Sequence, residues 1–173
     1  MDASEKKRWV RQLFVQYEGR LLRYLMKFTN SEMASEIVQE TFVKLLKIEN
    51  PQELQSRELP WLFRVSRNRA LDRLKKEKPM SHMKPGQEFL FDSDNPEEQM
   101  NRDQQKSNAI KLLAKLNSTQ KEVVRLKFQE NLTYKQISEV TGHSVGHVGV
   151  ILHESIKKLR QLSKNSDQKG GVQ

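Results

Sequence analysis

Apolar residues recur every three or four positions through most of the chain, whereas runs that alternate apolar and polar residues are nearly absent. In the first such segment, residues 5–29, apolar residues at steps of three or four are Trp9, Leu13, Tyr17, Leu21, Tyr24 and Phe28. A period near 3.6 residues is typical of amphipathic helices, while strands need a period of two. The sequence therefore predicts an all-α protein.

Capping and helix-breaking residues divide this pattern into short helices. The expected ranges are 5–29, 31–49, 60–78, 104–116, 118–128, 133–140 and 144–162. Ser31 is the expected N-cap of the second helix, and Pro51 ends that helix near Asn50. Two capping boxes, which begin at Asn117 and Thr133, open the fifth and sixth helices.

A change in composition after position 78 indicates a linker. Prolines and acidic residues cluster there, at Pro79, Pro85, Pro96, Asp92, Asp94, Glu97 and Glu98. We expect a helical domain at 1–78, a flexible acidic linker at 79–103, a second helical domain at 104–163 and a disordered tail at 164–173. The apolar linker residues 89–91 either dock on a partner or pack locally.

The charge balance favours a polyanionic partner. The chain carries 31 Lys and Arg against 22 Asp and Glu, a formal net charge of +9, although a solvated basic surface is the alternative. The chain contains no cysteine, which excludes disulfides, Cys-ligated zinc and a thiol switch. We find no apolar segment typical of a signal peptide or membrane span, so we expect a cytoplasmic protein.

The segment 133–160 has the layout of a helix-turn-helix, a short helix and a longer one joined by a turn at Gly142. The apolar positions expected to hold the two helices together are Ile137, Val140, Val148, Leu152, Ile156 and Leu159. The residues expected on the exposed face of the second helix are His147, Val150, His153, Glu154 and Lys157. This layout predicts binding to duplex DNA, and a helical hairpin that packs on a partner is the alternative.

The helix expected at 60–78 is densely basic and amphipathic. Its expected core side holds Leu62, Phe63, Ser66, Ala70 and Leu74, and its opposite side holds Trp61, Arg64, Asn68, Asp72 and Lys75. An aromatic residue among cations can stack on unpaired bases while the cations contact phosphates. This face predicts single-stranded DNA binding, unless Trp61 simply tucks into the neighbouring loop.

Four segments resemble the extracytoplasmic-function sigma factors of bacterial RNA polymerase. Residues 34–42, ASEIVQETF, resemble the region 2 pattern AEDLVQETF, and residues 61–72, WLFRVSRNRALD, resemble WLFRIARNLAID. Residues 117–126 resemble the start of region 4, and residues 132–160 resemble its helix-turn-helix. Because these segments occur in the family's order across a linker of suitable length, the resemblance is specific.

The resemblance implies a role for each segment. Docking on the clamp helices of the polymerase β-prime subunit is implied for Glu36, Gln39, Glu40 and Phe42. Recognition and melting of the minus-ten element are implied for Trp61, Arg64, Arg67, Asn68, Arg69, Arg73, Lys75 and Lys76. Recognition of the minus-thirty-five element is implied for Thr133, Tyr134, Ser144, Val145, Gly146, His147, Val150 and Lys157. Region 4 would also bind the β flap, and an anti-sigma factor is an expected partner.

The recognition helix departs from the family's pattern. The usual SxGTVKSRLxRA becomes residues 144–155, SVGHVGVILHES, so three basic positions are replaced by Gly149, Ile151 and Glu154. We therefore expect an unusual upstream element, or a greater reliance on backbone amides at the helix start. The other departures, at Ser35, Glu36 and Leu46, are mild.

Two other classes of protein stay open at this point. A DNA-binding regulator that never contacts polymerase would account for the helix-turn-helix and would often be a dimer, whereas we expect no stable homodimer. A helical interaction protein would use its charges only for solvation. We find no catalytic motif and expect no cofactor. His143, His147 and His153 lack a thiol or a suitably spaced carboxylate nearby, so we expect no metal site.

Overall fold

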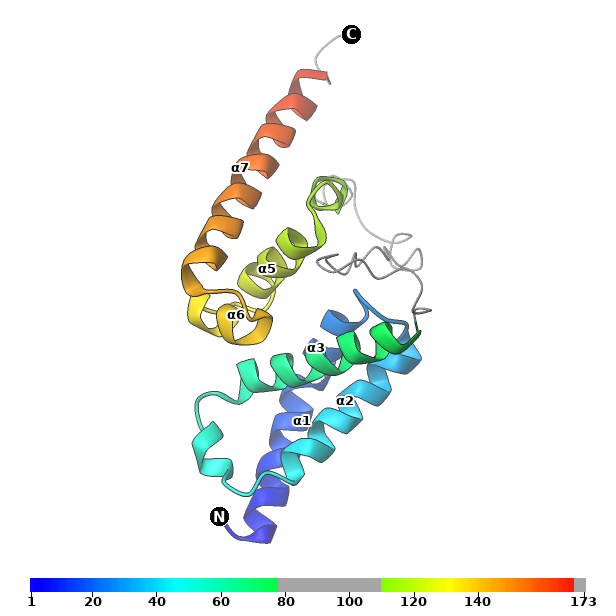
Figure 1. The fold of residues 1–173 in the computed structure, drawn as a ribbon, viewed down its shortest axis with the longest axis vertical. Helices are drawn as coiled ribbons and strands as arrows, with labels where there is room; N and C mark the ends of the chain where they lie inside the picture. The colour runs from blue at the N-terminus through cyan, green and yellow to red at the C-terminus, as the bar shows by residue number, and fades with distance from the viewer. Residues whose placement is uncertain (78–109, 170–173) are drawn as a thin grey trace. The chain divides into compact units, whose positions relative to one another are not determined.

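The computed structural model describes residues 1–77 and 110–169, and these ranges contain helices and no strand (Figure 1). The prediction of an all-α fold is therefore confirmed. The chain divides into two compact units between Ser93 and Asp94. The expected linker at 79–103, with its apolar residues 89–91, lies outside the described residues, as does the expected start of a helix at 104.

The first unit is a bundle of three α-helices and one short 3₁₀ helix. The helices are α1 (Ala3–Leu25), α2 (Ser31–Leu46), η1 (Pro51–Leu54) and α3 (Glu58–Glu77). Each of the three α-helices packs against the other two, as their close course in Figure 1 illustrates. The bundle thereby fixes α2 and α3, which carry most of the predicted functional residues, side by side.

Local hydrogen bonds explain where the structure differs from the expected helix ends. α1 begins earlier than expected because the Asp2 carboxylate accepts hydrogen bonds from the backbone of Ser4 and Glu5, and the Glu5 carboxylate accepts one from the backbone N–H of Asp2. The N-cap of α2 is Asn30, and the prediction of Ser31 was wrong. Asn30 has extended backbone and accepts a 2.8 Å hydrogen bond from the backbone of Met33, so Ser31 already lies inside the helix.

The core of the first unit is aliphatic with one aromatic cluster. Its fully buried side chains include Leu21, Leu25, Ile37, Leu45, Leu62 and Phe63. The ring of Tyr24 meets the rings of Phe63 and Phe28 edge-on, with centroids 5.0 and 4.8 Å away. Ser66 and Ala70 of α3 are buried as predicted, whereas Leu74 is only partly buried. Burial of this side leaves the polar side of α3 facing outward.

The second unit contains α5 (Ser118–Phe128), α6 (Tyr134–Thr141) and α7 (Val145–Lys169), and residues 110–114 are also helical. The capping boxes at Asn117 and Thr133 are both present as predicted. Gly142 ends α6 in the left-handed conformation, with φ of 81°, as the helix-turn-helix requires. Ser144 accepts a hydrogen bond from the backbone of His147 and so caps α7.

α7 is longer than the sequence suggested. It runs to Lys169 rather than ending near Leu162, because neither glycine nor proline lies between Leu162 and Gly170. The expected tail at 164–173 therefore begins inside this helix, and its last four residues lie outside the described part of the chain.

The buried side of α7 is wider than predicted. Val148 and Leu152 are buried as expected, and so are their partners Ile137 and Val140 on α6. Two further residues of α7, Ile151 and Ser155, are also buried, while Ile156 and Leu159 are only partly covered. The reason is that α7 packs against both α5 and α6, so a broader face is covered than one neighbouring helix would need.

Candidate nucleic-acid interface

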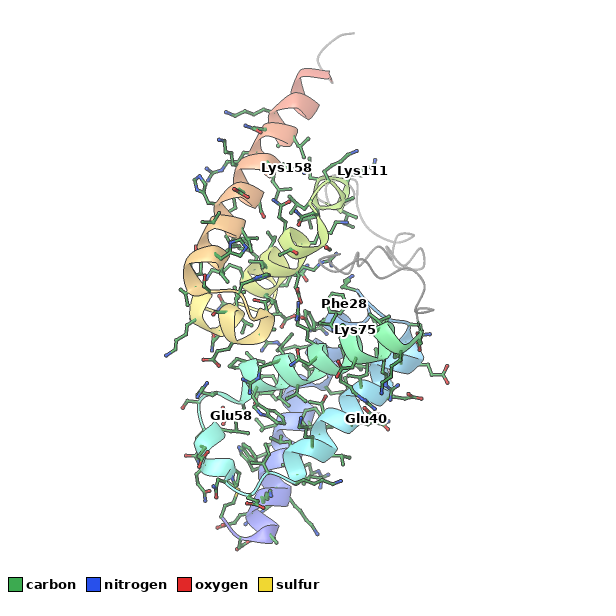
Figure 2. The ribbon with its side chains drawn as sticks, viewed as in Figure 1. Phe28, Glu40, Glu58, Lys75, Lys111 and Lys158 are labelled. Atoms are coloured by element: carbon green, nitrogen blue, oxygen red, sulfur yellow. The ribbon has the colours of Figure 1, made fainter. Side chains whose placement is uncertain are left out.

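An ion-pair network joins α2 to α3. Arg69 donates from Nε and Nη2 to the two carboxylate oxygens of Glu40. Arg73 donates to Glu40 from Nη2 and to Glu36 from Nη1. Glu40, which Figure 2 labels, thus receives two guanidinium groups from the helix beside its own. The network holds the predicted DNA-binding helix against the predicted polymerase-binding helix.

The network changes the acid–base properties of its members. The hydrogen bond from Arg69 is the largest effect holding the pKa of Glu40 below its ordinary value, and Arg73 adds to it. Conversely, the hydrogen bond to Glu40 raises the pKa of Arg69, and the hydrogen bond to Glu36 raises that of Arg73. The charges of Glu40, Arg69 and Arg73 are therefore fully developed near neutral pH.

Two grooves flank the network. One, of about 450 Å³, lies between α2 and α3 and is lined by Glu40, Thr41, Lys44, Trp61, Arg64, Val65, Asn68, Arg69 and Asp72. The other, of about 470 Å³, lies along α2 and is lined by Glu36, Gln39, Glu40, Val43, Lys44 and Lys47. Because Glu40 and Lys44 line both, they form a ridge between the two grooves.

The groove between α2 and α3 gathers the most distinctive of the predicted minus-ten residues. Trp61 is half-buried and shares this groove with the exposed side chains of Arg64 and Asn68. An aromatic ring, a guanidinium and an amide lined up on one helix face form a suitable surface for an unpaired base and its phosphate. Lys75 and Lys76 are exposed further along α3, outside the lining of this groove.

The other predicted residues of the first unit have different surroundings: some are ion-paired, one is exposed and others are buried or half-buried. Arg69 and Arg73 are engaged with carboxylates of α2, and Arg67 is half-buried. Gln39 is exposed, as a docking residue needs to be. Phe42 is buried and its ring lies 5.0 Å from that of Phe14, so Phe42 is expected to act by holding α2 in place.

Lys44 was missed by the sequence reasoning, although it lies in both grooves. It follows Glu40 by one helical turn and therefore shares its face. That spacing was the available signal, but Lys44 lies beyond Phe42, where the motif that resembles the family ends.

In the second unit, every predicted minus-thirty-five residue is exposed. These residues are Thr133, Tyr134, Ser144, Val145, Gly146, His147, Val150 and Lys157. They lie at the start of α6 and along α7, as in a helix-turn-helix whose second helix enters the major groove. The predicted exposure of His153 and Glu154 is also confirmed.

The three departures in α7 have different surroundings. Ile151 is buried, so this position has become part of the core. A Cβ added at Gly149 would lie 3.6 Å from Cε2 of Tyr134, which is ordinary van der Waals contact. The ring of Tyr134 in turn lies 5.6 Å from the ammonium of Lys127. Glu154 alone presents a changed charge on the exposed face.

Two histidines lie close together around the start of α7. The rings of His143 and His147 meet edge-on at 5.1 Å. Across residues 1–77 and 110–169, no group of three potential metal ligands comes together. None of the helices in the same ranges combines the length and the apolar character that a membrane span requires.

Comparison with known proteins shows the family. Residues 13–79 match sigma-70 region 2, and residues 112–161 match sigma-70 region 4. RNA polymerase sigma factor YlaC of Bacillus subtilis (strain 168) is 24% identical over 164 residues, which is 92% of this chain and 95% of YlaC. RNA polymerase sigma factor SigV of the same organism is 30% identical over 140 residues, or 78% of this chain and 79% of SigV.

The fold also has a counterpart among solved structures. CnrH, solved in complex with the cytosolic domain of CnrY, aligns with a TM-score of 0.60 at 22% identity over 94% of this chain and 92% of CnrH. Both sigma-70 regions occur in the expected order, and the relatives match across the two of them. The chain belongs to the extracytoplasmic-function sigma factors and is an RNA polymerase sigma factor for promoter-specific transcription.

Proposed function

We propose that the two grooves of the first unit and the outer face of α7 have three separate roles. The groove along α2 docks on the clamp helices of the polymerase, and the groove between α2 and α3 opens and reads the minus-ten element. α7 reads the minus-thirty-five element. The observation that carries the proposal is the meeting of Trp61, Arg64 and Asn68 in one groove beside the docking helix.

The groove between α2 and α3 suits melted DNA for a physical reason. A base that stacks on an aromatic side chain gains about 1–3 kcal/mol, which offsets part of the cost of unpairing it. The amide of Asn68 can donate and accept hydrogen bonds at a base edge, and Arg64 can contact the adjoining phosphate. Binding to duplex DNA would offer no exposed base face to Trp61, so the melted state is the one this groove stabilises.

The groove along α2 has the mixed character of a protein-binding surface. Val43, which lines this groove together with Gln39, is 49% exposed, and Leu46, further along α2 and outside the groove lining, is 42% exposed. Apolar contacts from these valine and leucine side chains would supply affinity, while polar groups at the rim would set the register. Because Glu36 and Glu40 already bind Arg73, their carboxylates position α3 while α2 docks.

Catalysis in this scheme belongs to the polymerase core, and the chain supplies recognition in the cytoplasm. An anti-sigma factor is a further proposed partner. The relative CnrH, whose fold this chain shares, was solved with the cytosolic domain of CnrY bound. We infer that a protein of similar role holds this chain until it is needed.

The separate roles of the two grooves can be tested with two variants in parallel. Trp61→Ala should keep binding to core polymerase but lose permanganate reactivity of thymines near the start site, which reports unpaired bases. Val43→Glu should instead lose core binding, because it adds a charge to the docking groove. If both variants lose the same step, the two grooves do not have separate roles.

A further inference from the structure

Val150 occupies the centre of the outward face of α7. Residues two positions apart on an α-helix are separated by about 200°, so Val150 lies nearly opposite both Val148 and Leu152. These two residues are buried against α5 and α6, with exposed fractions of 0% and 2%. Val150 itself is 51% exposed. The part of the helix that reaches furthest from the core therefore carries an apolar side chain.

Gly146, one turn before Val150, shares this outward face. A Cβ built at Gly146 would meet no atom within 4 Å, so packing inside the second unit does not require glycine there. Glycine within a helix costs about 0.5–1 kcal/mol relative to alanine. A glycine that packing does not explain, on a face directed at DNA, allows the backbone to approach closely. Close approach is what a short side chain such as valine needs to reach a base edge.

The chemistry of valine restricts what it can recognise. Valine has no hydrogen-bond donor or acceptor in its side chain, so it gains nothing from the polar groups that bases present in the major groove. Thymine adds an apolar group there, its 5-methyl, which apolar side chains contact. The family pattern quoted above has serine at this position, and serine can hydrogen-bond to several bases. Valine in its place changes the recognition from polar to apolar.

We propose that Val150 determines promoter specificity by contacting the 5-methyl group of a thymine in the minus-thirty-five element. The inference rests on the proposed placement of α7 in the major groove. It adds to that placement the group that is recognised, the thymine 5-methyl, and the residue that contacts it, Val150. It also explains why the element should be unusual, since a thymine is selected where the common pattern offers a hydroxyl.

The test removes the methyl group and leaves base pairing unchanged. Promoters are first located by mapping transcript 5′ ends made by core polymerase with the full chain. Each thymine of the shared upstream motif, on either strand, is then replaced singly by deoxyuridine, and holoenzyme binding is measured by competition. We expect one position, or two neighbouring ones, to lose about fourfold in affinity, the effect of withdrawing one buried methyl group.

Variants at position 150 test whether Val150 causes the loss of affinity seen with deoxyuridine. Val150→Ser should bind the thymine and deoxyuridine promoters equally, and Val150→Thr, which keeps one methyl, should retain part of the difference. Val15→Ser is the matched control, because Val15 is 77% exposed on α1 in the other unit. It should keep the full deoxyuridine effect. Equal thermal unfolding of the variants excludes misfolding, since position 150 lies outside the core.

The outcomes separate this inference from the proposed function. Discrete start sites with no thymine sensitive to deoxyuridine would overturn the role of Val150 and leave the sigma-factor activity standing. A deoxyuridine effect of the same size in Val150→Ser would overturn it too, because another residue would then contact the methyl. Absence of discrete start sites would overturn the proposed function itself.

Discussion

Arg69 of α3 and Glu40 of α2 form a two-point ion pair, with both Nε and Nη2 of the guanidinium donating to the carboxylate. From the sequence these residues were expected to serve different partners, DNA and polymerase. The structure shows that each has the other as a partner in the isolated chain. The helix proposed to dock on the polymerase and the helix proposed to open the promoter are therefore joined directly to each other.

Glu40→Gln is predicted to weaken the packing of α3 on α2. The side chains of Arg69 and Glu40 are 42% and 40% exposed, so solvent screens the pair and the loss in free energy of unfolding should be below about 1 kcal/mol. Urea unfolding at pH 7 measures it. Glu49→Gln, which removes an exposed carboxylate elsewhere in the unit, should change stability less. Equal losses would indicate that only net charge matters.

Glu40 should also make the stability of the first unit depend on pH. The pKa of Glu40 in the folded chain lies below 4.5, chiefly because Arg69 donates to the carboxylate. A lowered folded pKa contributes stability that is present above the unfolded pKa and is lost as pH falls through the folded pKa. As the pH falls from neutral to below 4.5, wild type should thus lose more stability than Glu40→Gln. If the free energies of unfolding of the two proteins fell in parallel with pH, the ion pairs of Glu40 would not be the source of the pH dependence.

Arg64 and Arg73 should differ in their effect on binding to single-stranded minus-ten DNA. Arg64 is exposed in the groove, and Arg73 is occupied by two carboxylates. Arg64→Ala should reduce the slope of log affinity against log salt by about 0.7, the value for one phosphate contact on a single strand. Arg73→Ala should mainly lower stability and leave the slope nearly unchanged. A larger change in slope for Arg73→Ala than for Arg64→Ala would indicate that Arg73, and not Arg64, contacts the DNA.

Replacing either of two glycines around the start of α7 by alanine should change the stability of the second unit, but in opposite directions. Gly142 has φ of 81°, so Gly142→Ala should destabilise the second unit by about 1 kcal/mol. Gly146 is helical with open space around it, so Gly146→Ala should stabilise the unit by about 0.5–1 kcal/mol. Gly146→Ala should nevertheless weaken promoter binding, because the added methyl group holds the backbone away from DNA. Thermal unfolding and holoenzyme binding together check both effects, and unaltered binding by Gly146→Ala would remove the close-approach argument.

Glu154→Arg should strengthen binding to the upstream promoter element. Glu154 is exposed on the outer side of α7, where a carboxylate repels phosphates. Replacing it restores a basic residue that the family pattern has at this position. Competition binding at two salt concentrations measures the gain and its salt dependence. Unchanged affinity and sequence preference would show that position 154 does not face DNA.

Periodicity and capping signals were enough to predict the helices and the helix-turn-helix, because these features depend on neighbours within a few residues. The capping box at Thr133 and the exposure of Arg64 and Asn68 are of this kind. The pairing of Glu40 with Arg69 could not be predicted, since 29 positions separate them and only packing of α2 on α3 brings them together. Burial of Ile151 likewise could not be predicted from the pattern of α7 alone, because α7 packs against both α5 and α6.

The most direct test of the central claim is transcription from the host's genomic DNA by bacterial core RNA polymerase with and without this chain, followed by sequencing of transcript 5′ ends. We expect discrete start sites that require the chain and share upstream motifs at both promoter elements. Failure of the chain to bind core polymerase, or start sites that are unchanged when it is added, would contradict the account.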